Sequence, residues 1–261
     1  MDQGEGGRLA VAIVTGAASG IGRATVELFV ERGWSVVAVD WASDHLDWCR
    51  QSDRIAVVIG DVSDEATNAA MVTTALERFG RLDAAVLNAG IVGSPAIEAA
   101  GAIERLDDVL AVNVRGVVLG IRHAAPALRT TGGGAIVATA STAGFGGDPG
   151  NWAYNASKAA VINLVRAAAI DYATQGIRVN AVAPGPVETA MTARLVDLPE
   201  VHEAMARRIP LQRWGQPREL AEAIWFLASP AASFITGVTV PVDGGLSASA
   251  GHYDLPARPE I

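Results

Sequence analysis

A tyrosine and a lysine four residues apart form the pair of side chains in this sequence best suited to acid–base chemistry. Tyr154 and Lys158 stand at the start of a stretch with helical periodicity, so their spacing puts both on one helix face. An ammonium beside a phenol favours the phenolate and lowers the tyrosine pKa. Lys158 is the only lysine among twenty basic residues, and arginine cannot replace its compact charge. The pair predicts a tyrosine that exchanges a proton with an alcohol or carbonyl near neutral pH; an exposed lysine at an ordinary helix start is the alternative.

Two further polar residues are candidates for the same chemistry. Ser141 follows an apolar run thirteen residues before Tyr154, where its hydroxyl could hold a substrate oxygen. A plain turn serine is the alternative. Asn113 lies in an apolar helical stretch and needs a polar partner. It either binds a water that relays protons to Lys158 or satisfies the core.

A glycine-rich segment near the N-terminus predicts a dinucleotide site. Residues 15–22 read TGAASGIG, after an apolar run and before a helical pattern. Glycines permit the tight turn and let backbone N–H groups approach a pyrophosphate, while the helix N-terminus stabilises the anion. The residues expected to bind the dinucleotide here are Gly16, Ser19, Gly20, Ile21 and Gly22. A glycine turn without a ligand is the alternative.

The acidic residue after the second strand predicts which dinucleotide binds. Asp40 stands 18 residues after Gly22 and is followed by Trp41 rather than a basic residue. A carboxylate here can accept hydrogen bonds from both ribose hydroxyls and repel a 2′-phosphate, so NAD is expected rather than NADP. The other cofactor-binding candidates follow the third and fourth strands: Asp61, Val62, Asn88, Ala89 and Gly90. Surface or Asx-turn positions are the alternative for the polar ones.

Apolar strand-like runs alternate with amphipathic helical stretches along the whole chain. Strands are expected at 9–14, 35–39, 55–59, 83–87, 135–139, 177–182 and 238–240. Helices are expected at 20–31, 64–78 with Ser63 as N-cap, 106–129, 152–174 and 217–228. This alternation predicts an α/β, doubly wound fold with a mostly parallel sheet of about seven strands and helices on both faces. Residues 1–261 should form one domain, with a substrate-pocket excursion at about 185–216 and a tail at 246–261.

Composition excludes several classes of protein. The net charge of −8 without a basic stripe speaks against nucleic-acid binding. No apolar run reaches the ~18 residues of a transmembrane helix, so no membrane association is expected. The single cysteine and the acidic, glycine-rich start without a signal-peptide pattern suit a cytoplasmic protein. A chain of 261 residues buries enough surface to need no structural metal, and no metal site is expected.

The order and spacing of these pieces resemble the short-chain dehydrogenase/reductase family. The matching segments are TGAASGIG (15–22), Asp40, Asp61 with Val62, NAG (88–90), Asn113, Ser141, Tyr154 with Lys158, PGPVET (184–189) and VDGG (242–245). The resemblance implies a Rossmann fold and a Ser–Tyr–Lys triad assisted by Asn113, with Tyr154 and Lys158 also touching the cofactor. It implies further cofactor contacts from Pro184, Gly185, Val187 and Thr189, the last two at the nicotinamide end. It also implies a homotetramer built partly through the two long helices. Ala140, where relatives often carry a second serine, is a small departure.

The substrate pocket is expected to be mostly apolar. Its predicted residues are Ser94, Thr142, Phe145, Asn151, Trp152 and Met191. Such a lining suits a hydrophobic alcohol or ketone. One of four arginines in the excursion could bind an anionic substrate group, although a solvated role is the alternative for each: Arg194, Arg207, Arg208 and Arg213.

Together these residues predict an NAD-dependent oxidoreductase, an alcohol dehydrogenase or carbonyl reductase that interconverts a small secondary alcohol and a ketone. One alternative is a 3-oxoacyl-[acyl-carrier-protein] reductase. Such an enzyme would normally prefer NADP and carry a basic docking surface. Asp40 and the single lysine speak against it. The other is a non-catalytic dinucleotide-sensing protein, which the intact Ser141, Tyr154 and Lys158 set disfavours.

Overall fold

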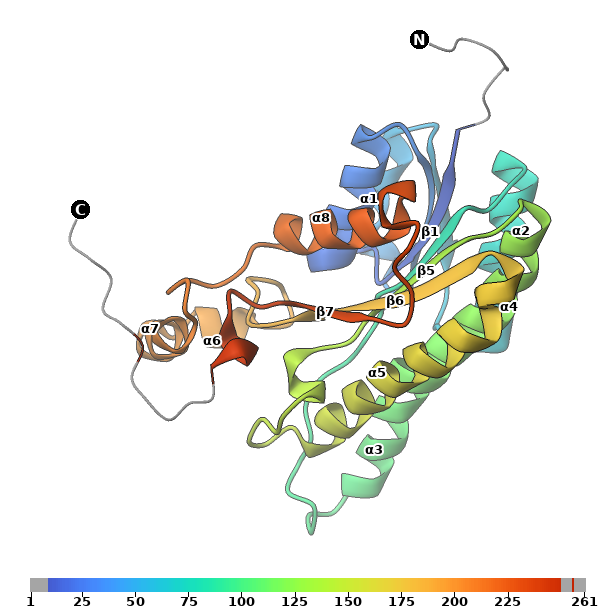
Figure 1. Cartoon of the computed structure of the whole chain (residues 1–261). Helices are drawn as coiled ribbons and strands as arrows, with labels where there is room; N and C mark the ends of the chain where they lie inside the picture. The colour runs from blue at the N-terminus through green and yellow to red at the C-terminus, as the bar shows by residue number, and fades with distance from the viewer. Residues whose placement is uncertain (1–8, 250–254, 256–261) are drawn as a thin grey trace, which may run out of the picture.

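The computed structural model describes residues 9–249 and residue 255. One parallel sheet lies at its centre, with seven strands in the order β3-β2-β1-β4-β5-β6-β7. Helices lie on both faces of the sheet (Figure 1). The reversal of strand order between β1 and β4 is the switch point at which such sheets bind ligands. The predicted doubly wound Rossmann fold is confirmed.

The elements follow the predicted alternation of strand and helix. The strands are β1 (Val11–Thr15), β2 (Ser35–Asp40), β3 (Ile55–Ile59), β4 (Ala84–Leu87), β5 (Gly134–Thr139), β6 (Ile177–Pro184) and β7 (Thr239–Val242). The α-helices are α1 (Gly20–Glu31), α2 (Glu65–Phe79), α3 (Ala102–Leu110), α4 (Gly116–Thr130), α5 (Trp152–Tyr172), α6 (Ala193–Val196), α7 (Pro199–Arg208) and α8 (Pro217–Ala228). Most strand bounds differ from the predicted ones by one or two residues.

Two local predictions need correction. The helix expected at 106–129 consists of α3, a π-helical turn at Ala111–Arg115 and α4. The N-cap of α2 is Asp64 rather than Ser63, because residues 61–64 form a turn in which the Asp64 N–H donates to the Asp61 carbonyl at 3.1 Å and the Ser63 N–H donates to the Asp61 carboxylate at 2.8 Å. This Asx turn delays the helix by one residue.

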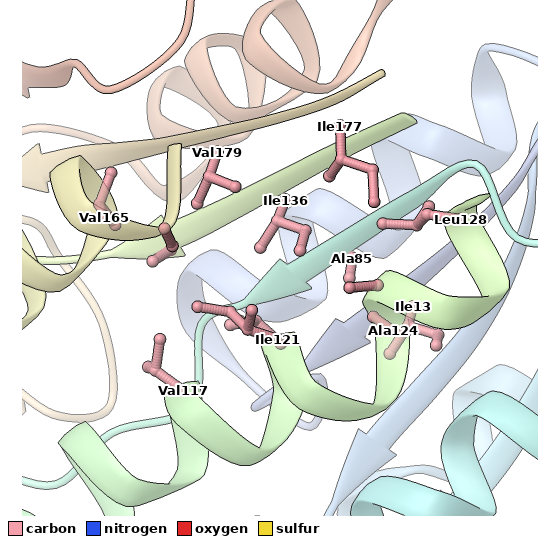
Figure 2. Close-up of a cluster of buried hydrophobic side chains, with 14 of the residues drawn as sticks. Ile13, Ala85, Val117, Ile121, Ala124, Leu128, Ile136, Val165, Ile177 and Val179 are labelled. Atoms are coloured by element: carbon pink, nitrogen blue, oxygen red, sulfur yellow. The ribbon is translucent and has the colours of Figure 1, made fainter. Parts of the chain in front are cut away.

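Two apolar layers fix the sheet between its helices. Figure 2 shows one of them, in which Ile13, Ile136 and Val179 of the sheet pack against residues of the long helices. The second layer joins the other face of the sheet to α1 and α8, and it includes the fully buried Phe29 and Ile224. Burying each such side chain contributes about 1.5–3 kcal/mol. The strand ends are therefore held on a rigid base.

The predicted excursion leaves β6 and returns to α8 at the carboxyl edge of the sheet (Figure 1). It carries α6 and α7, and α7 itself has no buried residue. Trp214, whose side chain is only 2% exposed, packs against α7. Its ring stacks on His202 at 5.0 Å between centroids, and its Nε1 donates to the His202 carbonyl at 3.0 Å. The excursion is thus anchored by a few specific contacts.

The predicted tail lies mostly outside the described residues. Its first part forms a short 3-10 turn at Leu246–Ala248. Within the described part of the chain, no helix combines the length and the apolar character needed to cross a membrane.

Candidate active site

Tyr154 and Ser141 meet at the carboxyl edge of the sheet, where β5 ends and α5 begins. The Ser141 hydroxyl hydrogen-bonds the Tyr154 side chain and also accepts the Ala143 N–H at 3.1 Å. Burial raises the pKa of Tyr154, and the Ser141 hydrogen bond offsets part of that rise. The buried serine therefore holds the phenol in a fixed position.

Lys158 lies one helical turn further along α5 and is only 3% exposed. Its Nζ is 5.5 Å from the centroid of the Tyr154 ring and donates to the Thr139 carbonyl at 2.7 Å. Burial lowers the pKa of Lys158 to about 8. Thr139 is the sole acceptor for Nζ within residues 9–249, so N–H groups remain for a ligand.

One expectation about this pair is wrong. The pKa of Tyr154 is raised rather than lowered, because burial disfavours the phenolate and the Asp148 charge adds to this effect. Tyr154 therefore carries its proton at neutral pH.

Asn113 is fully buried and its side chain is occupied by protein partners. Its Oδ1 accepts the Ile91 N–H at 2.8 Å, and its Nδ2 donates to the Ile91 carbonyl and the Ser157 hydroxyl, both at 3.0 Å. The side chain thus has the partners expected of a core asparagine. It fastens the segment after β4 to α5. A Cβ at Gly90 would lie 3.2 Å from Asn113 Oδ1 and 3.4 Å from Lys158 Nζ, so glycine permits this close approach.

The glycine turn between β1 and α1 forms a backbone cradle. Gly16 and Gly20 have φ values of +68° and +53°, which favour glycine. A Cβ at Gly22 would lie 1.9 Å from the Gly16 carbonyl oxygen. Ser19 precedes α1 in extended conformation without a side-chain cap, and Ile21 lies in the first helical turn. The N-terminal N–H groups of α1 thus have no side-chain acceptor, as an anion site requires.

Asp40 ties the glycine turn to the end of β2. Its Oδ2 accepts the Ala18 N–H at 2.9 Å, and its Oδ1 accepts the Ala42 N–H at 3.1 Å. Each carboxylate oxygen keeps acceptor capacity for a ribose hydroxyl. Trp41 beside it is exposed.

Asn88 links three strands at the switch point. Its side chain donates to the Thr15 carbonyl at 3.0 Å and accepts the Thr139 hydroxyl at 3.1 Å. The Thr15 hydroxyl accepts the N–H groups of Asn88 and Ala89 at 2.9 and 3.0 Å. Asn88 therefore fixes the sheet as expected, whereas Asp61 is exposed and forms the Asx turn described above, next to buried Val62.

The segment after β6 lies against the glycine turn. Pro184 accepts the Thr142 hydroxyl at 3.2 Å, and the Gly185 N–H donates to the Val242 carbonyl at 3.1 Å. Buried Val187 pairs with Gly215 in an isolated parallel bridge. Thr189 reaches the turn itself, because a Cβ at Gly20 would lie 3.2 Å from its Cβ and Cγ2.

A cavity of 530 Å³ opens between α1 and this segment, lined in part by Gly20, Arg23, Thr189 and Ala193. Tyr154 does not line it, and neither do the predicted substrate residues. Those residues hold the loops around Tyr154 instead. The Ser94 hydroxyl accepts the Ala153 N–H at 3.1 Å, and Trp152 Nε1 donates to the Pro95 carbonyl at 2.7 Å.

Three other predicted pocket residues lie at exposed or helix-end positions. Phe145 and Met191 are exposed, and Asn151 occupies the N-cap position of α5. Two of the four excursion arginines have acidic partners: Arg213 pairs with Glu219 at 2.5 Å and Arg207 with Glu203 at 3.4 Å. Among the described residues, Arg194 and Arg208 have no ion pair.

Three residues of the site were missed by the sequence interpretation. Thr139 acts through its backbone carbonyl, and Asp148 through its charge near Tyr154, so neither has a motif. Thr15 could have been found, since it directly precedes the first glycine of the turn.

The fold and this site define the class of protein to which the chain belongs. Residues 16–247 match a family described as enoyl-(acyl carrier protein) reductase. The chain is a member of the short-chain dehydrogenase/reductase family of oxidoreductases.

Curated relatives match over most of their length. The chain is 40% identical to 2-(R)-hydroxypropyl-CoM dehydrogenase of Xanthobacter autotrophicus over 91% of this chain and 98% of the relative. It is 44% identical to cis-4-hydroxycyclohexanecarboxylate dehydrogenase of Sinomonas cyclohexanicum, over 91% and 96%. A solved structure, 3-ketoacyl-(acyl-carrier-protein) reductase from Brucella melitensis complexed with NADH, superposes with a TM-score of 0.83 at 37% identity, covering 91% of this chain and 98% of that one.

Proposed function

We propose that this protein is an NAD-dependent oxidoreductase that interconverts a secondary alcohol and a ketone on a largely apolar small molecule. The observation that carries the proposal is the grouping of Tyr154, Ser141 and Lys158 at the same edge of the sheet as the glycine turn, because the segment after β4 contacts both Lys158 and Gly16. A proton-transferring phenol and an oxygen-holding hydroxyl are what alcohol–ketone chemistry requires. The names of the relatives are consistent with this reaction.

The residues of the glycine turn fit a nicotinamide dinucleotide. A Cβ at Gly22 would fill the cradle, and α1 offers N–H groups to a pyrophosphate. Asp40 favours NAD over NADP, because a carboxylate repels a 2′-phosphate. Val187 and Thr189 are proposed to contact the nicotinamide end, and Lys158 the adjoining ribose. The bound dinucleotide supplies the hydride acceptor or donor of the reaction.

The side chains then have distinct roles. In reduction, Tyr154 donates its proton to the carbonyl oxygen, and burial keeps that proton on the phenol at neutral pH until the substrate binds. Ser141 holds the same oxygen by a hydrogen bond and steadies its developing charge. In oxidation, Tyr154 takes the hydroxyl proton, which requires the neighbouring ammonium of Lys158 and the positive charge of the oxidised cofactor. Asn113 holds α5 in place through its hydrogen bond to the Ser157 hydroxyl.

The chain is proposed to act as one domain within a cytoplasmic homotetramer. The exposed apolar residues Val118 of α4 and Ile170 of α5 favour an assembly through the long helices.

A second candidate is a 3-oxoacyl-[acyl-carrier-protein] reductase, which is favoured by the similarity to the Brucella reductase. An assay of an acetoacetyl thioester with NADH and NADPH separates the two. Faster turnover of the thioester than of every ketone tested would support this candidate.

Replacing Tyr154 by phenylalanine tests the main proposal. Y154F should lose turnover while NAD⁺ binding, measured by calorimetry, stays unchanged, because only the phenolic oxygen is removed. The matched control is Y172F, at the far end of α5, which should keep both. Turnover should be measured on a panel of secondary alcohols, cyclic alcohols, dihydrodiols and hydroxy acids. Hydroxy acids are included because Arg194 and Arg208, which lack ion pairs in the described chain, could bind a carboxylate. Full turnover by Y154F would overturn the catalytic assignment.

A further inference from the structure

The helix that carries Tyr154 begins without a cap of its own. Asn151 occupies the N-cap position of α5, but its side chain caps none of the described N–H groups. The first N–H groups of a helix need acceptors from elsewhere, because the helix backbone supplies none. Ala153, the second residue of α5, is fully buried, so water cannot serve as the acceptor for its N–H. Tyr154 is the next residue, and its backbone belongs to this same first turn.

A serine far away in the sequence supplies the missing cap. The Ser94 hydroxyl accepts the Ala153 N–H at 3.1 Å, which is the hydrogen bond that an N-cap side chain normally makes at this position. Trp152, the residue before Ala153, is bound to the same loop, because its Nε1 donates to the Pro95 carbonyl at 2.7 Å. Both residues that precede Tyr154 are thus fastened to residues 94–95.

The loop that carries Ser94 is itself held from another side. Residues 91–95 are neither helical nor extended in a strand, and Gly93 has a φ of +100°. Arg105 of α3, which packs beside α5 (Figure 1), donates through Nη2 to the Val92 carbonyl at 2.6 Å and through Nε to the Gly93 carbonyl at 3.0 Å. Arg105 therefore fixes the two residues immediately before Ser94.

The cap bears on Tyr154 more than on Lys158. The phenol of Tyr154 reaches the Ser141 hydroxyl from the first turn of α5, so its position depends on where that turn begins. Lys158 lies one turn further along the helix, and its ammonium is tied to the Thr139 carbonyl at 2.7 Å. Loss of the cap should therefore displace the phenol while the ammonium stays in place.

We infer that Ser94 and Arg105 are positioning residues, which set the place of the Tyr154 phenol by capping the first turn of α5 from a braced loop. The inference rests on the proposed function and deepens it. Both side chains act through the backbone of α5 rather than on the reacting atoms. A misplacement of about 1 Å can slow an enzyme by about a hundredfold, so such support matters to turnover.

Replacing Ser94 by alanine tests the cap. With the alcohol of the panel that the wild type oxidises fastest, S94A should lower kcat by about tenfold, because a frayed first turn misplaces the phenol. The Kd for NAD⁺, measured by calorimetry, should stay unchanged, because Lys158 and the glycine turn keep their contacts. Hydrogen exchange of the amides of residues 152–156 should become faster. S94T keeps the hydroxyl and should restore both kcat and protection.

Arg105 provides a second variant that does not depend on the folding of S94A. R105M removes both hydrogen bonds to the loop and should lower kcat in the same direction. Because the two residues act through one loop, the S94A/R105M double variant should be little slower than S94A, whereas independent residues would multiply their effects. The control S229A removes a hydroxyl that accepts the Ala231 N–H at 3.3 Å beyond the end of α8, and it should leave kcat unchanged.

Each result decides between these roles. An S94A protein with faster exchange at the start of α5 but wild-type kcat overturns the positioning role and leaves the proposed function intact. Unchanged exchange shows that Ser94 is not the cap, and a fall in kcat matched by a fall in the fraction of chains that bind NAD⁺ shows a general loss of folding; both overturn the inference. If S94A does not fold, R105M is judged by the same results. A wild type that oxidises no alcohol of the panel and reduces no ketone removes the proposed function and this inference together.

Discussion

At the scale of single residues, the site is built around a cation that the fold keeps away from water. Lys158 is buried and its ammonium has the Thr139 carbonyl as its hydrogen-bond partner in the described chain. Burial of a charge costs stability, and the pKa of about 8 is the measure of that cost. A side chain kept at such a cost is typical of functional sites rather than of cores.

This cost predicts a pH-dependent difference in stability between the wild type and K158M. The pKa of Lys158 is about 8 in the folded chain and 10.5 for a lysine surrounded by water, so between these values the unfolded chain binds more protons. Stability of the wild type should therefore rise with pH relative to K158M, by about 2 kcal/mol from pH 7 to pH 9.5. Urea unfolding of both proteins measures it, and the comparison cancels other titrating groups. A difference that stays constant with pH would contradict the folded-state pKa.

Asp40 predicts a change in dinucleotide preference. D40A removes a charge that repels a 2′-phosphate, so binding of NADP⁺ relative to NAD⁺ should improve by roughly tenfold, about 1.4 kcal/mol. NAD⁺ affinity should fall as well, because the Ala18 N–H loses its acceptor. The control D47A removes an exposed acid from the nearby loop and should change neither. Calorimetric titration of both dinucleotides gives the answer, and a wild type that already prefers NADP⁺ would refute the assignment.

At the scale of elements, the glycine turn depends on contacts that leave no room for a side chain. G22A would place a Cβ 1.9 Å from the Gly16 carbonyl oxygen, so the turn must open. We expect the G22A variant to lose about 1–3 kcal/mol of stability. We also expect it to bind NADH more weakly. G146A should change stability by less than about 0.5 kcal/mol, because no atom lies within 4 Å of its Cβ. Thermal unfolding and NADH fluorescence measure both, and equal behaviour of the two variants would show that the cradle is not tight.

The strands and helices could be predicted well from the sequence, but the hydrogen bonds between them could not. A strand such as β5 is buried on both faces, so its apolar run is visible in residue types alone. The contacts of Lys158 with Thr139 and of Asn113 with Ile91 end on backbone atoms, which every residue type carries. The raised pKa of Tyr154 likewise depends on burial, which a spacing of four residues does not reveal.

At the scale of the whole molecule, the proposed assembly depends on exposed apolar residues of the long helices. The side chain of Ile170 on α5 is 78% exposed. A monomer can tolerate single exposed apolar residues, but an assembly through the long helices would cover this one. I170E should therefore reduce the proposed tetramer to smaller species by introducing a charge that cannot be buried unpaired. Light scattering coupled to size exclusion measures the mass. L76E, on the exposed side of α2, is the control and should leave the mass unchanged; a monomeric wild type would refute the assembly.

The two ends of the excursion pair with each other, and this pairing affects how far the length of the excursion can change. Val187 and Gly215 form a bridge, and the Glu188 and Gly215 N–H groups reach across to the opposite chain segment at 3.0 and 2.9 Å. Everything between them is a loop already closed at its base, and lengthening such a loop costs only about 0.6 kcal/mol per doubling. Changes of length within residues 193–213 should therefore be tolerated while the sheet and the proposed proton donor stay where they are.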